Sequence, residues 1–357
     1  MPKLLLKGNE AIGEAAILAG CRHFFGYPIT PQNEIPEHLS RRMPEVGGVY
    51  VQSESEVAAI NMVYGAGGAG ARVMTTSSSV GIALMQEGIS YLCGAEIPCL
   101  LVNVMRAGPG LGGIQAAQAD YFQITRGGGN GDYRVLSYAP ASVQEMMELV
   151  IEGFDVADFY RNPVMIAADG MLGQMMESVD LEAVQARPRR PLPEKDGWQT
   201  SGCGDRRPPN HLCSLILDPH ALEQHNLALQ EKYRRIAAAE VRWEGWGLED
   251  AEVVAVAYGS MARIVRSAAA QLRQEGCRVG LVRPITLWPF PAAAFAGLPA
   301  SVRALISVEM SCGQMVDDVR LAANGRWPVE FFGRSGGVVP TVAEVVACLR
   351  AIQEGRR

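Results

Sequence analysis

The most informative stretch of this sequence is Tyr27-Pro28-Ile29-Thr30-Pro31, which follows the short apolar run His23-Phe24-Phe25-Gly26. Each proline fixes its own backbone and biases the residue before it toward an extended conformation. A stiff turn at the C-terminal end of a strand suits the presentation of one hydroxyl to a ligand. We therefore predict a strand at 23–26, followed by a rigid turn that presents Thr30.

Length and composition indicate an ordinary globular protein with more than one domain. The chain has 357 residues, of which 48% are hydrophobic and 20% are charged, and chains of this length usually divide into domains. The net charge of −6 argues against nucleic acid or an anionic membrane as the main partner. No apolar run reaches the ~20 residues of a membrane span, and Met1–Gly8 is not a secretory signal. We expect a cytoplasmic protein.

The eight cysteines do not form a recognisable metal motif. None stands in a C-x-x-C pair, and the closest two, Cys93 and Cys99, have no second pair to complete a site. Zinc and iron–sulfur ligands usually come in such pairs. We expect free thiols in a reducing cytosol and no metal bound by this chain alone.

Alternating helix and strand patterns over residues 1–186 indicate a doubly wound α/β domain. The segment Pro98–Met105 is apolar on both faces, as parallel strands buried between two helical layers are. Asn9 and Ser142 are residue types that cap helices, and Glu145 has the capping-box spacing after Ser142. The other predicted strands are 49–52, 72–76 and 164–168, and the predicted helices are 9–19, 56–65, 82–93 and 142–160.

A change of composition marks the end of this domain. Residues 187–246 are rich in Pro, Gly and charged residues, which is typical of a linker, and we expect one helix within it at 221–240. A second α/β unit occupies 247–357 and begins with the apolar run 252–260. Its other predicted elements are strands at 278–282 and 304–308 and helices at 261–274 and 341–353.

Glu56 is the first candidate for chemistry. It closes Gln52-Ser-Glu-Ser-Glu56, immediately before a helix whose next residues are small and apolar. A carboxylate in these dry surroundings at a helix N-terminus can bond a ring nitrogen of a ligand. The plainer alternative is that Glu54 and Glu56 only favour the start of the helix, as acids in first turns commonly do.

Arg106 is the second candidate. It ends the buried strand and precedes Ala107-Gly-Pro-Gly-Leu-Gly-Gly113. A guanidinium at the C-terminal edge of a strand can bind a carboxylate through two parallel hydrogen bonds. The alternative is a surface arginine at the point where the strand emerges.

Four other stretches favour a plain interpretation. Gly65–Gly70 matches G-x-G-x-x-G but follows a helix and precedes a strand, the reverse of the dinucleotide-binding order. Gly108–Gly113 matches and follows a strand, with Asp132 at a suitable distance, but no second strand clearly intervenes. The hydroxyl-rich turn Thr75–Gly81 could lend donors to a cofactor or cap the next helix, and we favour the cap. Arg126–Tyr133 could form a lid or a subunit contact, but we favour a mobile surface loop.

Together these segments resemble the α subunit of the thiamine-diphosphate-dependent 2-oxoacid:ferredoxin oxidoreductases. Tyr27–Pro31 is similar to the signature turn of that family. Gln52–Glu56, with Gly65 nine residues on, is similar to its helix with the cofactor-activating glutamate. Val104–Arg106 is similar to its substrate-arginine segment. The resemblance covers nearly the whole chain outside the linker.

The second domain carries the rest of the resemblance. Gly259-Ser260 and Arg283–Pro289 are similar to the C-terminal domain of transketolase. Glu309, Gly313–Arg320 and Gly333–Gly337 are similar to the branch that acts on branched-chain 2-oxoacids, although 2-oxoglutarate enzymes share nearly all of these motifs. The expected fold is a pyrimidine-binding domain followed by a transketolase-C-like domain.

The resemblance implies a role for each matching position. Glu56, chosen over Glu54 by its spacing to the helix glycine, would face N1′ of the aminopyrimidine of thiamine diphosphate. Thr30 would hydrogen-bond the oxygens of the substrate, and Arg106 would pair with its carboxylate. The implied cofactor-binding residues are Tyr27, Pro28, Ile29 and Glu56.

The resemblance also implies partner subunits. The diphosphate end of the cofactor needs a Gly-Asp-Gly turn and a downstream Asn, but the nearest match is Ala168-Asp169-Gly170 and the next asparagine is Asn210. A β subunit would therefore hold the diphosphate and Mg²⁺, a ferredoxin-like δ subunit the [4Fe-4S] clusters, and a γ subunit further contacts. The active site would lie at a subunit interface.

The implied activity is oxidative decarboxylation of a branched-chain 2-oxoacid or 2-oxoglutarate with CoA to acyl-CoA and CO2, with electrons passing to ferredoxin. One alternative is a thiamine-dependent dehydrogenase or synthase subunit with another acyl acceptor. A second alternative is a non-catalytic assembly subunit that keeps the fold.

Overall fold

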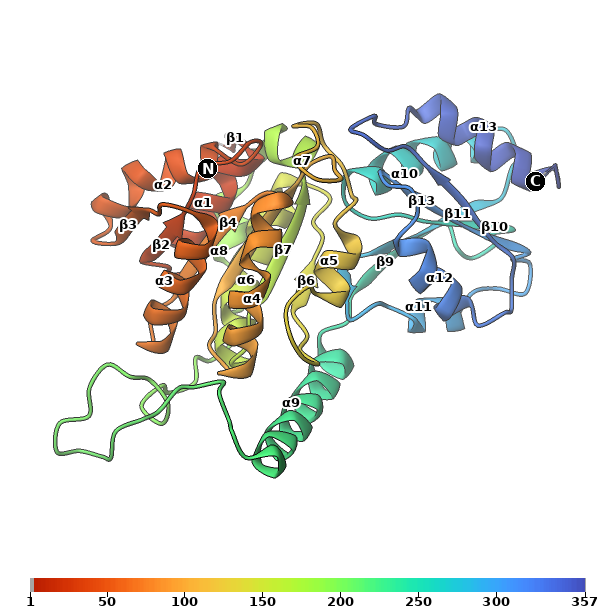
Figure 1. Cartoon of the computed structure of the whole chain (residues 1–357). Coiled ribbons are helices and arrows are strands. Elements are labelled where there is room, and N and C mark those ends of the chain that lie inside the picture. Colours follow the sequence, from red (N-terminus) through yellow and green to blue (C-terminus); the bar gives the residue numbers. More distant parts are fainter. Residues whose placement is uncertain (1–2, 357) are drawn as a thin grey trace.

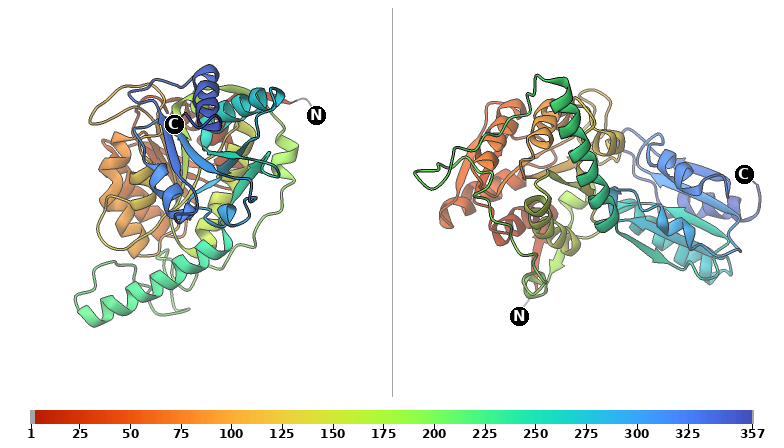
Figure 2. Two further views of the ribbon diagram at one scale, coloured as in Figure 1. Left: turned by 90° about the vertical axis from the view of Figure 1, so that its right-hand side faces the viewer. Right: turned by 90° about the horizontal axis from the view of Figure 1, so that it is seen from below.

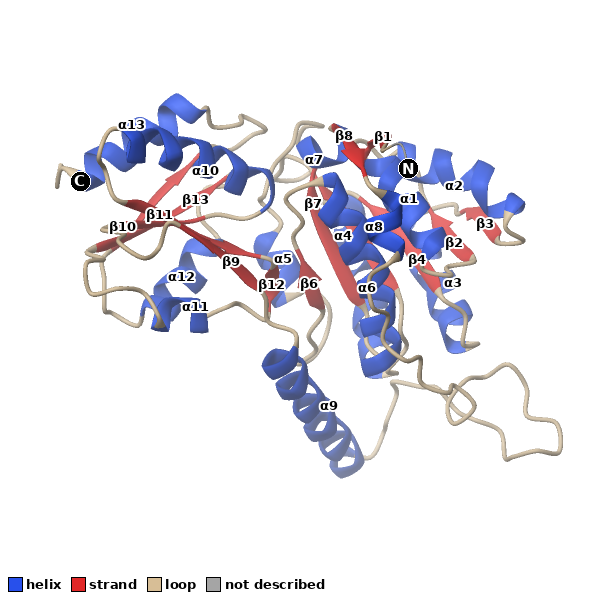
Figure 3. Cartoon of the chain, turned by 180° about the vertical axis from the view of Figure 1, so that it is seen from behind, coloured by secondary structure: helices blue, strands red, loops and turns tan. Residues whose placement is uncertain are grey.

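The computed structural model describes residues 3–356 and consists of two α/β domains joined by a long linker (Figure 1). Each domain has a central sheet with helices on both faces (Figure 3). This confirms the fold class expected from the alternating patterns.

The first domain is built on a seven-stranded sheet in the order β12-β6-β7-β5-β4-β2-β3, parallel except for β12. Every side chain of β5 and β7 is buried, as the two helical layers require. The strands are β2 (His23–Gly26), β3 (Val49–Gln52), β4 (Val73–Ser77), β5 (Leu100–Met105), β6 (Leu136–Tyr138), β7 (Val164–Asp169) and β12 (Thr286–Trp288). A separate antiparallel pair joins β1 (Leu4–Lys7) to β8 (Met176–Val179).

Alternate residues of the central strands serve the two faces of this sheet. Leu100 and Val102 pack in the cluster with α1, α2 and α6, whereas Leu101 packs in the cluster with α3 and α4. The helices are α1 (Gly8–Leu18), α2 (Glu34–Glu45), α3 (Glu56–Gly68), α4 (Val80–Gly94), α5 (Tyr121–Arg126), α6 (Val143–Tyr160), α7 (Gly170–Gln174) and α8 (Leu181–Gln185).

The linker leaves the first domain as an extended arm and ends in α9 (Pro219–Ala239). Asp218 caps this helix by accepting a hydrogen bond from Ala221 N at 2.7 Å, and buried Tyr233 and Ile236 pack it against the first domain. Figure 2 shows α9 crossing the underside of that domain. The helix expected at 221–240 is confirmed, displaced by one or two residues.

The second domain has a five-stranded sheet in the order β14-β13-β10-β11-β9, parallel except for β9. Helices α10 and α13 share one buried cluster, while α11 and α12 belong to the cluster that continues into the first domain. The elements are β9 (Trp243–Trp246), β10 (Val253–Val256), α10 (Gly259–Gln274), β11 (Val279–Pro284), α11 (Ala293–Ala296), β13 (Ala304–Glu309), α12 (Met315–Ala323), β14 (Val329–Gly333) and α13 (Val342–Gln353).

One predicted cap is wrong. Helix α1 begins at Gly8, so Asn9 lies inside its first turn and is fully buried. Its side-chain nitrogen instead donates to Pro31 O and to Glu34 Oε2, each at 2.7 Å. The same residue type that caps helices therefore ties α1 to the turn that follows β2. Ser142 does cap α6, accepting from Glu145 N at 3.1 Å.

The two domains meet through buried hydrogen bonds. Asp169, at the end of β7, accepts from Ser260 N at 2.8 Å and Ser260 Oγ at 2.6 Å, and also caps α7 through Leu172 N. A Cβ at Gly259 would lie 2.6 Å from Asp169 Oδ2. The acid of the nearest Gly-Asp-Gly match is therefore committed to holding the start of α10.

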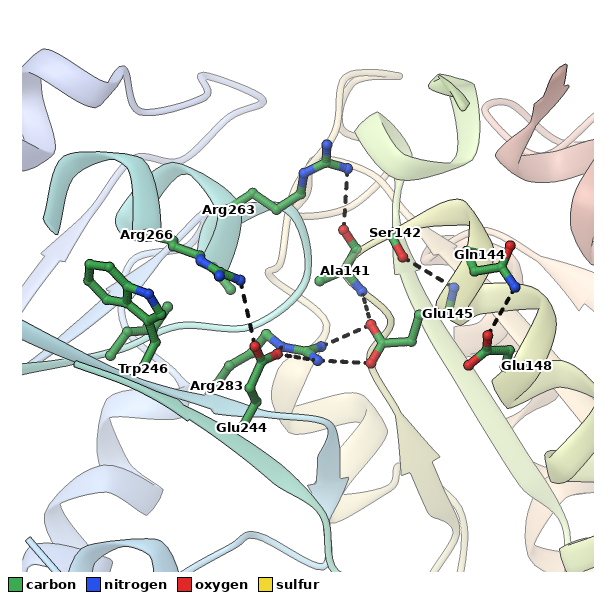
Figure 4. A pocket seen from close by; sticks show the side chains of 12 residues that line it. Ala141, Ser142, Gln144, Glu145, Glu148, Glu244, Trp246, Arg263, Arg266 and Arg283 are labelled. Atoms are coloured by element: carbon green, nitrogen blue, oxygen red, sulfur yellow. Dashed lines mark hydrogen bonds and ion pairs between the residues drawn. The ribbon is translucent and has the colours of Figure 1, made fainter. Parts of the chain in front are cut away.

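A second contact between the domains surrounds a cavity of about 400 Å³ (Figure 4). Arg283 from β11 donates two hydrogen bonds to Glu145 of α6, at 3.0 and 2.8 Å, and a third to Glu244 of β9 at 2.9 Å. Arg266 lies 3.6 Å from the same Glu244. The charges around this cavity largely satisfy one another, as charges at a domain joint must.

Candidate active site

The candidate residues lie at the carboxyl edge of four neighbouring parallel strands. In the order β5-β4-β2-β3, these strands end at Arg106, at the hydroxyl-rich turn, at Tyr27–Pro31 and just before Glu56. Ligands of open α/β sheets bind in the crevice outside this edge. Four segments far apart in sequence thus form one rim.

The turn Tyr27–Pro31 is held from several sides. Besides Asn9, the fully buried Gln32 donates to Tyr27 O at 3.2 Å and accepts from Thr76 Oγ1 at 2.5 Å. The hydroxyl of Thr30 has only a long contact of 3.5 Å with Asn33 Nδ2. The turn is therefore rigid, while the hydroxyl that it presents is available to a ligand.

Glu56 is a buried acid without a partner. It is the first residue of α3 and is 5% exposed, whereas Glu54 is exposed. Within residues 3–356 no hydrogen bond or ion pair engages its carboxylate. A buried carboxylate normally has such partners, so this position calls for a group from outside the chain.

The first turn of α4 leaves room for the Glu56 carboxylate. A Cβ at Gly81 would lie 2.5 Å from Glu56 Oε1 and would overlap Ser77 Oγ. Glycine is therefore required where α4 passes the acid.

Arg106 is 6% exposed and connects two segments of the rim. Its Nη1 donates to Thr30 O and its Nη2 to Leu111 O, both at 2.9 Å. The Nε atom is buried and has no hydrogen-bond partner among the residues that the structure describes. The guanidinium is thus fixed by two carbonyls and still has donors free for an anion.

Three hydroxyls at the end of β4 are also unpaired. The side-chain oxygens of Thr75, Ser77 and Ser78 are buried without a hydrogen-bond partner in the described part of the chain. The predicted capping role of this turn is wrong, because the N-cap of α4, Ser79, makes no side-chain capping bond. The alternative, that the turn lends polar groups to a ligand, is consistent with these free atoms.

Ser79 is the centre of a network that sequence reasoning missed. Its φ of 29° is rare for a non-glycine residue, and such strain concentrates at functional sites. Its hydroxyl donates to Asp120 Oδ2 at 2.6 Å and accepts from Arg106 N at 2.9 Å, while its N–H donates to Asn103 Oδ1. The only sequence signal was the concentration of hydroxyls before α4.

Asp120 completes this network. Its Oδ2 also accepts from Asn103 Nδ2 at 3.0 Å. Burial raises the pKa of Asp120, although the bonds from Ser79 and Asn103 and the charge of Arg106 oppose the shift. The start of α4 thus lies beside both candidates. Ser79 accepts a hydrogen bond from Arg106 N, and Gly81 passes the Glu56 carboxylate.

A cavity of about 610 Å³ opens beside this network, between the two domains. Its size is that of a small-molecule site. It is lined by the start of α4, the loop after Arg106, the segment before α5 and two loops of the second domain. The residues that line it include Ser79, Val80, Leu111, Asp120, Met310 and Cys312.

Glu309 fixes the second-domain wall of this cavity. It is fully buried and accepts bonds from Ser307, Ser311 and the first backbone N–H groups of α12. The loop 310–314 is thereby held in place. Glu309 thus shapes the cavity by positioning this loop, but its own side chain does not line the cavity.

The two glycine-rich runs do not form dinucleotide turns. Gly65–Gly70 closes α3, and no helix begins directly after Gly108–Gly113, because α5 starts at Tyr121. The second run instead wraps the Arg106 guanidinium through Leu111 O.

Residues 3–356 can also be compared with the expectations for metal ligands, cysteines and membrane spans. No cluster of three or more His, Cys, Asp or Glu side chains there has the arrangement of a metal site. All eight cysteines are free, and burial raises the pKa of the Cys21 and Cys93 thiols to about 12. None of the described helices combines the length and apolar character needed to cross a membrane.

Known protein families match both domains. Residues 14–216 match the thiamine-diphosphate-binding domain of pyruvate flavodoxin/ferredoxin oxidoreductases, and residues 251–345 match core domain II of pyruvate:ferredoxin oxidoreductase. A ketoisovalerate oxidoreductase subunit VorB from Methanothermobacter thermautotrophicus is 50% identical, over 99% of this chain and 98% of its own. The chain belongs to the α subunits of the 2-oxoacid:ferredoxin oxidoreductases.

Other members of the family are more distant. A 2-oxoglutarate synthase subunit KorA from Methanocaldococcus jannaschii is 37% identical, over 93% of this chain and 95% of its own. The solved 2-oxoglutarate:ferredoxin oxidoreductase of Magnetococcus marinus, with 2-oxoglutarate, coenzyme A and succinyl-CoA bound, is 27% identical with a TM-score of 0.87. This chain covers 65% of that longer one, and 99% of its own residues align.

The fold extends to transketolase. An inactive β4 tetramer of a split-gene transketolase aligns over 99% of both chains with a TM-score of 0.59 and 15% identity. This likeness concerns the fold alone. It confirms the transketolase-type arrangement of two domains that the sequence motifs predicted.

Proposed function

We propose that this α subunit takes part in the oxidative decarboxylation of a branched-chain 2-oxoacid, such as 3-methyl-2-oxobutanoate, with CoA as acyl acceptor. The observation that carries the proposal is the buried, unpartnered Glu56 carboxylate at the same strand edge as Arg106. The 50% identity to a ketoisovalerate oxidoreductase subunit supports a branched-chain substrate. Four 2-oxoglutarate synthase subunits are only 34 to 38% identical to this chain.

The residues present fit the aminopyrimidine half of thiamine diphosphate. Glu56 would share a proton with ring nitrogen N1′, which would supply the partner that its carboxylate lacks in this chain. Tyr27, Pro28 and Ile29 would line the same wall of the site, and the unpaired hydroxyls at the end of β4 offer further polar contacts. When bound, thiamine diphosphate supplies the carbon nucleophile for the 2-oxo group.

The substrate would bind beside the cofactor. Arg106 would receive its carboxylate through the donors not used by Thr30 O and Leu111 O. The available hydroxyl of Thr30 would bond the substrate's oxygens. Because both residues are already fixed by backbone contacts, little ordering is needed when the substrate binds.

Partner subunits would complete the site. A β subunit would hold the diphosphate and Mg²⁺, since Asp169 of the nearest Gly-Asp-Gly match is engaged by Ser260. Val57, Met62, Leu84 and Tyr91 are exposed apolar side chains on α3 and α4, and they would offer this subunit apolar contacts on the two helices that approach Glu56. A ferredoxin-like δ subunit would carry the [4Fe-4S] clusters that pass electrons to ferredoxin, and a γ subunit would make further contacts.

The test compares two neighbouring acids in the complex assembled with its partner subunits. Glu56→Gln is expected to lower CoA- and 2-oxoacid-dependent reduction of an electron acceptor by at least about 100-fold, the usual worth of acid–base catalysis. Glu54→Gln, an exposed acid two residues away, should leave the rate unchanged.

Two other results would redirect the assignment. An unchanged rate in Glu56→Gln would contradict the role of Glu56 and favour a non-catalytic assembly subunit. A reaction that needs lipoamide or a second carbonyl compound in place of CoA would indicate a dehydrogenase or synthase subunit.

A further inference from the structure

The cavity of about 610 Å³ beside Arg106 has a lining suited to an uncharged ligand group. Its walls include Val80, Leu111 and Met310, with several alanines and glycines between them. Arg106 touches the same loop through Leu111 O, and Val80 adjoins the glycine that passes the Glu56 carboxylate. The cavity thus borders the loop that Arg106 holds and the first turn of α4, which passes Glu56.

We propose that this cavity receives the aliphatic side chain of the 2-oxoacid and that Leu111 is the residue that determines specificity for it. The proposal rests on the proposed function, because it takes the substrate carboxylate to lie at Arg106. It adds the residue that selects the side chain of the substrate.

The backbone presents Leu111 outward. Its neighbour Gly112 has a φ of 59°, and a Cβ there would overlap the Ala107 carbonyl oxygen. The bond from Arg106 Nη2 to Leu111 O fixes the loop at 2.9 Å, while the Leu111 residue stays 81% exposed. The Leu111 side chain is therefore accessible to a ligand group in the cavity that it lines, and contact with an aliphatic group would remove it from water.

The charges of the cavity disfavour a second carboxylate. Its lining contains no Lys, Arg or His among the described residues, and its one ionisable acid is Asp120. The distal carboxylate of 2-oxoglutarate would lose its water there without gaining a cation, and it would approach a carboxyl group. A branched aliphatic chain pays neither cost and covers Leu111.

The experiment measures selectivity in the complex assembled with its partner subunits. For each variant, kcat/KM is determined with 3-methyl-2-oxobutanoate and with 2-oxoglutarate, and their ratio is compared with that of the unmodified enzyme. Leu111→Arg and Leu111→Ser are the test variants. Ile114→Arg and Ile114→Ser are matched controls, because Ile114 is a 57% exposed residue of the same loop that does not line the cavity.

The ratio is expected to fall at least about 10-fold in both Leu111 variants, since a few methyl groups in an apolar site are worth about 10- to 200-fold. Leu111→Arg should fall further than Leu111→Ser, because it adds a cation for the second carboxylate. The Ile114 variants should change the ratio by less than about 3-fold.

Each contrary outcome has one meaning. If the unmodified complex oxidises 2-oxoacids and Leu111 and Ile114 variants give the same ratio, the specificity role is wrong and the proposed function stands. If the unmodified complex oxidises no 2-oxoacid, the proposed function fails and the specificity role with it. Gel filtration identifies a variant that fails to assemble, and Leu111→Ala, which only shortens the side chain, then replaces it.

Discussion

At the scale of single residues, the site is defined by polar groups that the chain itself leaves unsatisfied. Among residues 3–356, Glu56 has no partner, and one nitrogen of Arg106 and three hydroxyls at the end of β4 are buried without one. Buried polar groups cost free energy unless they are paired. A protein that keeps several of them at one edge is adapted to a ligand more than to its own stability.

Asp120 offers a test of this trade between function and stability. Its folded-state pKa is raised by burial, so the folded chain holds this proton more tightly than the unfolded chain. The contribution of Asp120 to stability therefore falls as the pH rises from about 3.8 through the folded pKa. Asp120→Asn keeps an oxygen for both donors and removes this loss, so it should be at least as stable as the unmodified protein at pH 7.

Asp155 is the matched control, because its pKa is shifted in the opposite direction. Burial opposes the shift, but hydrogen bonds from Arg189 and Arg72 lower its pKa. Its stabilising effect is present above the unfolded pKa and is lost as the pH falls. Asp155→Asn should therefore lower the melting temperature at pH 7, and thermal melts of the assembled enzyme between pH 4 and 8 compare the two. A lower melting temperature for Asp120→Asn at pH 7 would contradict the account of Asp120.

At the scale of elements, the start of α4 links both halves of the site, and Gly81 tests that link. Gly81→Ala places a methyl group 2.0 Å from Ser77 Oγ and 2.5 Å from Glu56 Oε1, so both side chains must move. Alanine favours a helix over glycine by about 0.5–1 kcal/mol, which limits the loss of stability. We expect activity to fall at least about 10-fold while the melting temperature changes by only a few degrees.

Gly65→Ala in α3 is the control for Gly81. A Cβ at Gly65 would meet no atom within 4 Å, so activity should persist and stability should rise slightly. Equal activity in both alanine variants would exclude a close fit between α4 and Glu56. Steady-state rates and thermal melts of the two complexes provide the comparison.

The local sequence pattern predicted the helices and strands of this fold far better than it predicted which strands pair in the sheets. The strands at 23–26, 49–52 and 98–105 followed from apolar runs, and Thr30, Glu56 and Arg106 stand shortly after their ends. By contrast, β12 joins the sheet of the first domain beside β6, across about 150 residues of chain. No local pattern encodes such a pairing, since it depends on the register of distant segments.

The same limit explains which site residues were missed. Glu56 and Arg106 stand in recognisable motifs, but Gln32 and Ser79 are ordinary polar residues in sequence. Gln32 matters because Thr76 lies opposite, and Ser79 because Asp120 and Arg106 meet at its hydroxyl. Asn9 was misread for this reason too: its partners, Pro31 and Glu34, lie beyond the local window.

At the scale of the whole molecule, the substrate cavity exists only because the two domains are held together. Its walls come from the loop after Arg106 in one domain and from the loop 310–314 in the other. The joint depends on Asp169, whose buried carboxylate accepts both the N–H and the hydroxyl of Ser260. Closing the joint therefore shapes the cavity as well as stabilising the fold.

The last prediction compares two helix caps. Asp169 caps α7 and also holds Ser260, whereas Asp180 only caps α8, through Ala183 N at 3.0 Å. Asp180→Ala should cost about 1 kcal/mol, the usual worth of a cap. Asp169→Ala should cost about 3 kcal/mol, because it also leaves a buried N–H and hydroxyl unpaired.

Denaturant unfolding of the assembled enzyme measures both costs, and limited proteolysis between α9 and β10 reports whether the domains separate. Only Asp169→Ala should open that segment to cleavage, because the second domain then loses its anchor at the start of α10. It should also raise KM for the 2-oxoacid, since one wall of the cavity moves. Equal costs and equal cleavage in the two variants would mean that Asp169 only caps α7, and that the domains are held together by other contacts, such as those of Arg283 with Glu145 and of Gln118 with Tyr258.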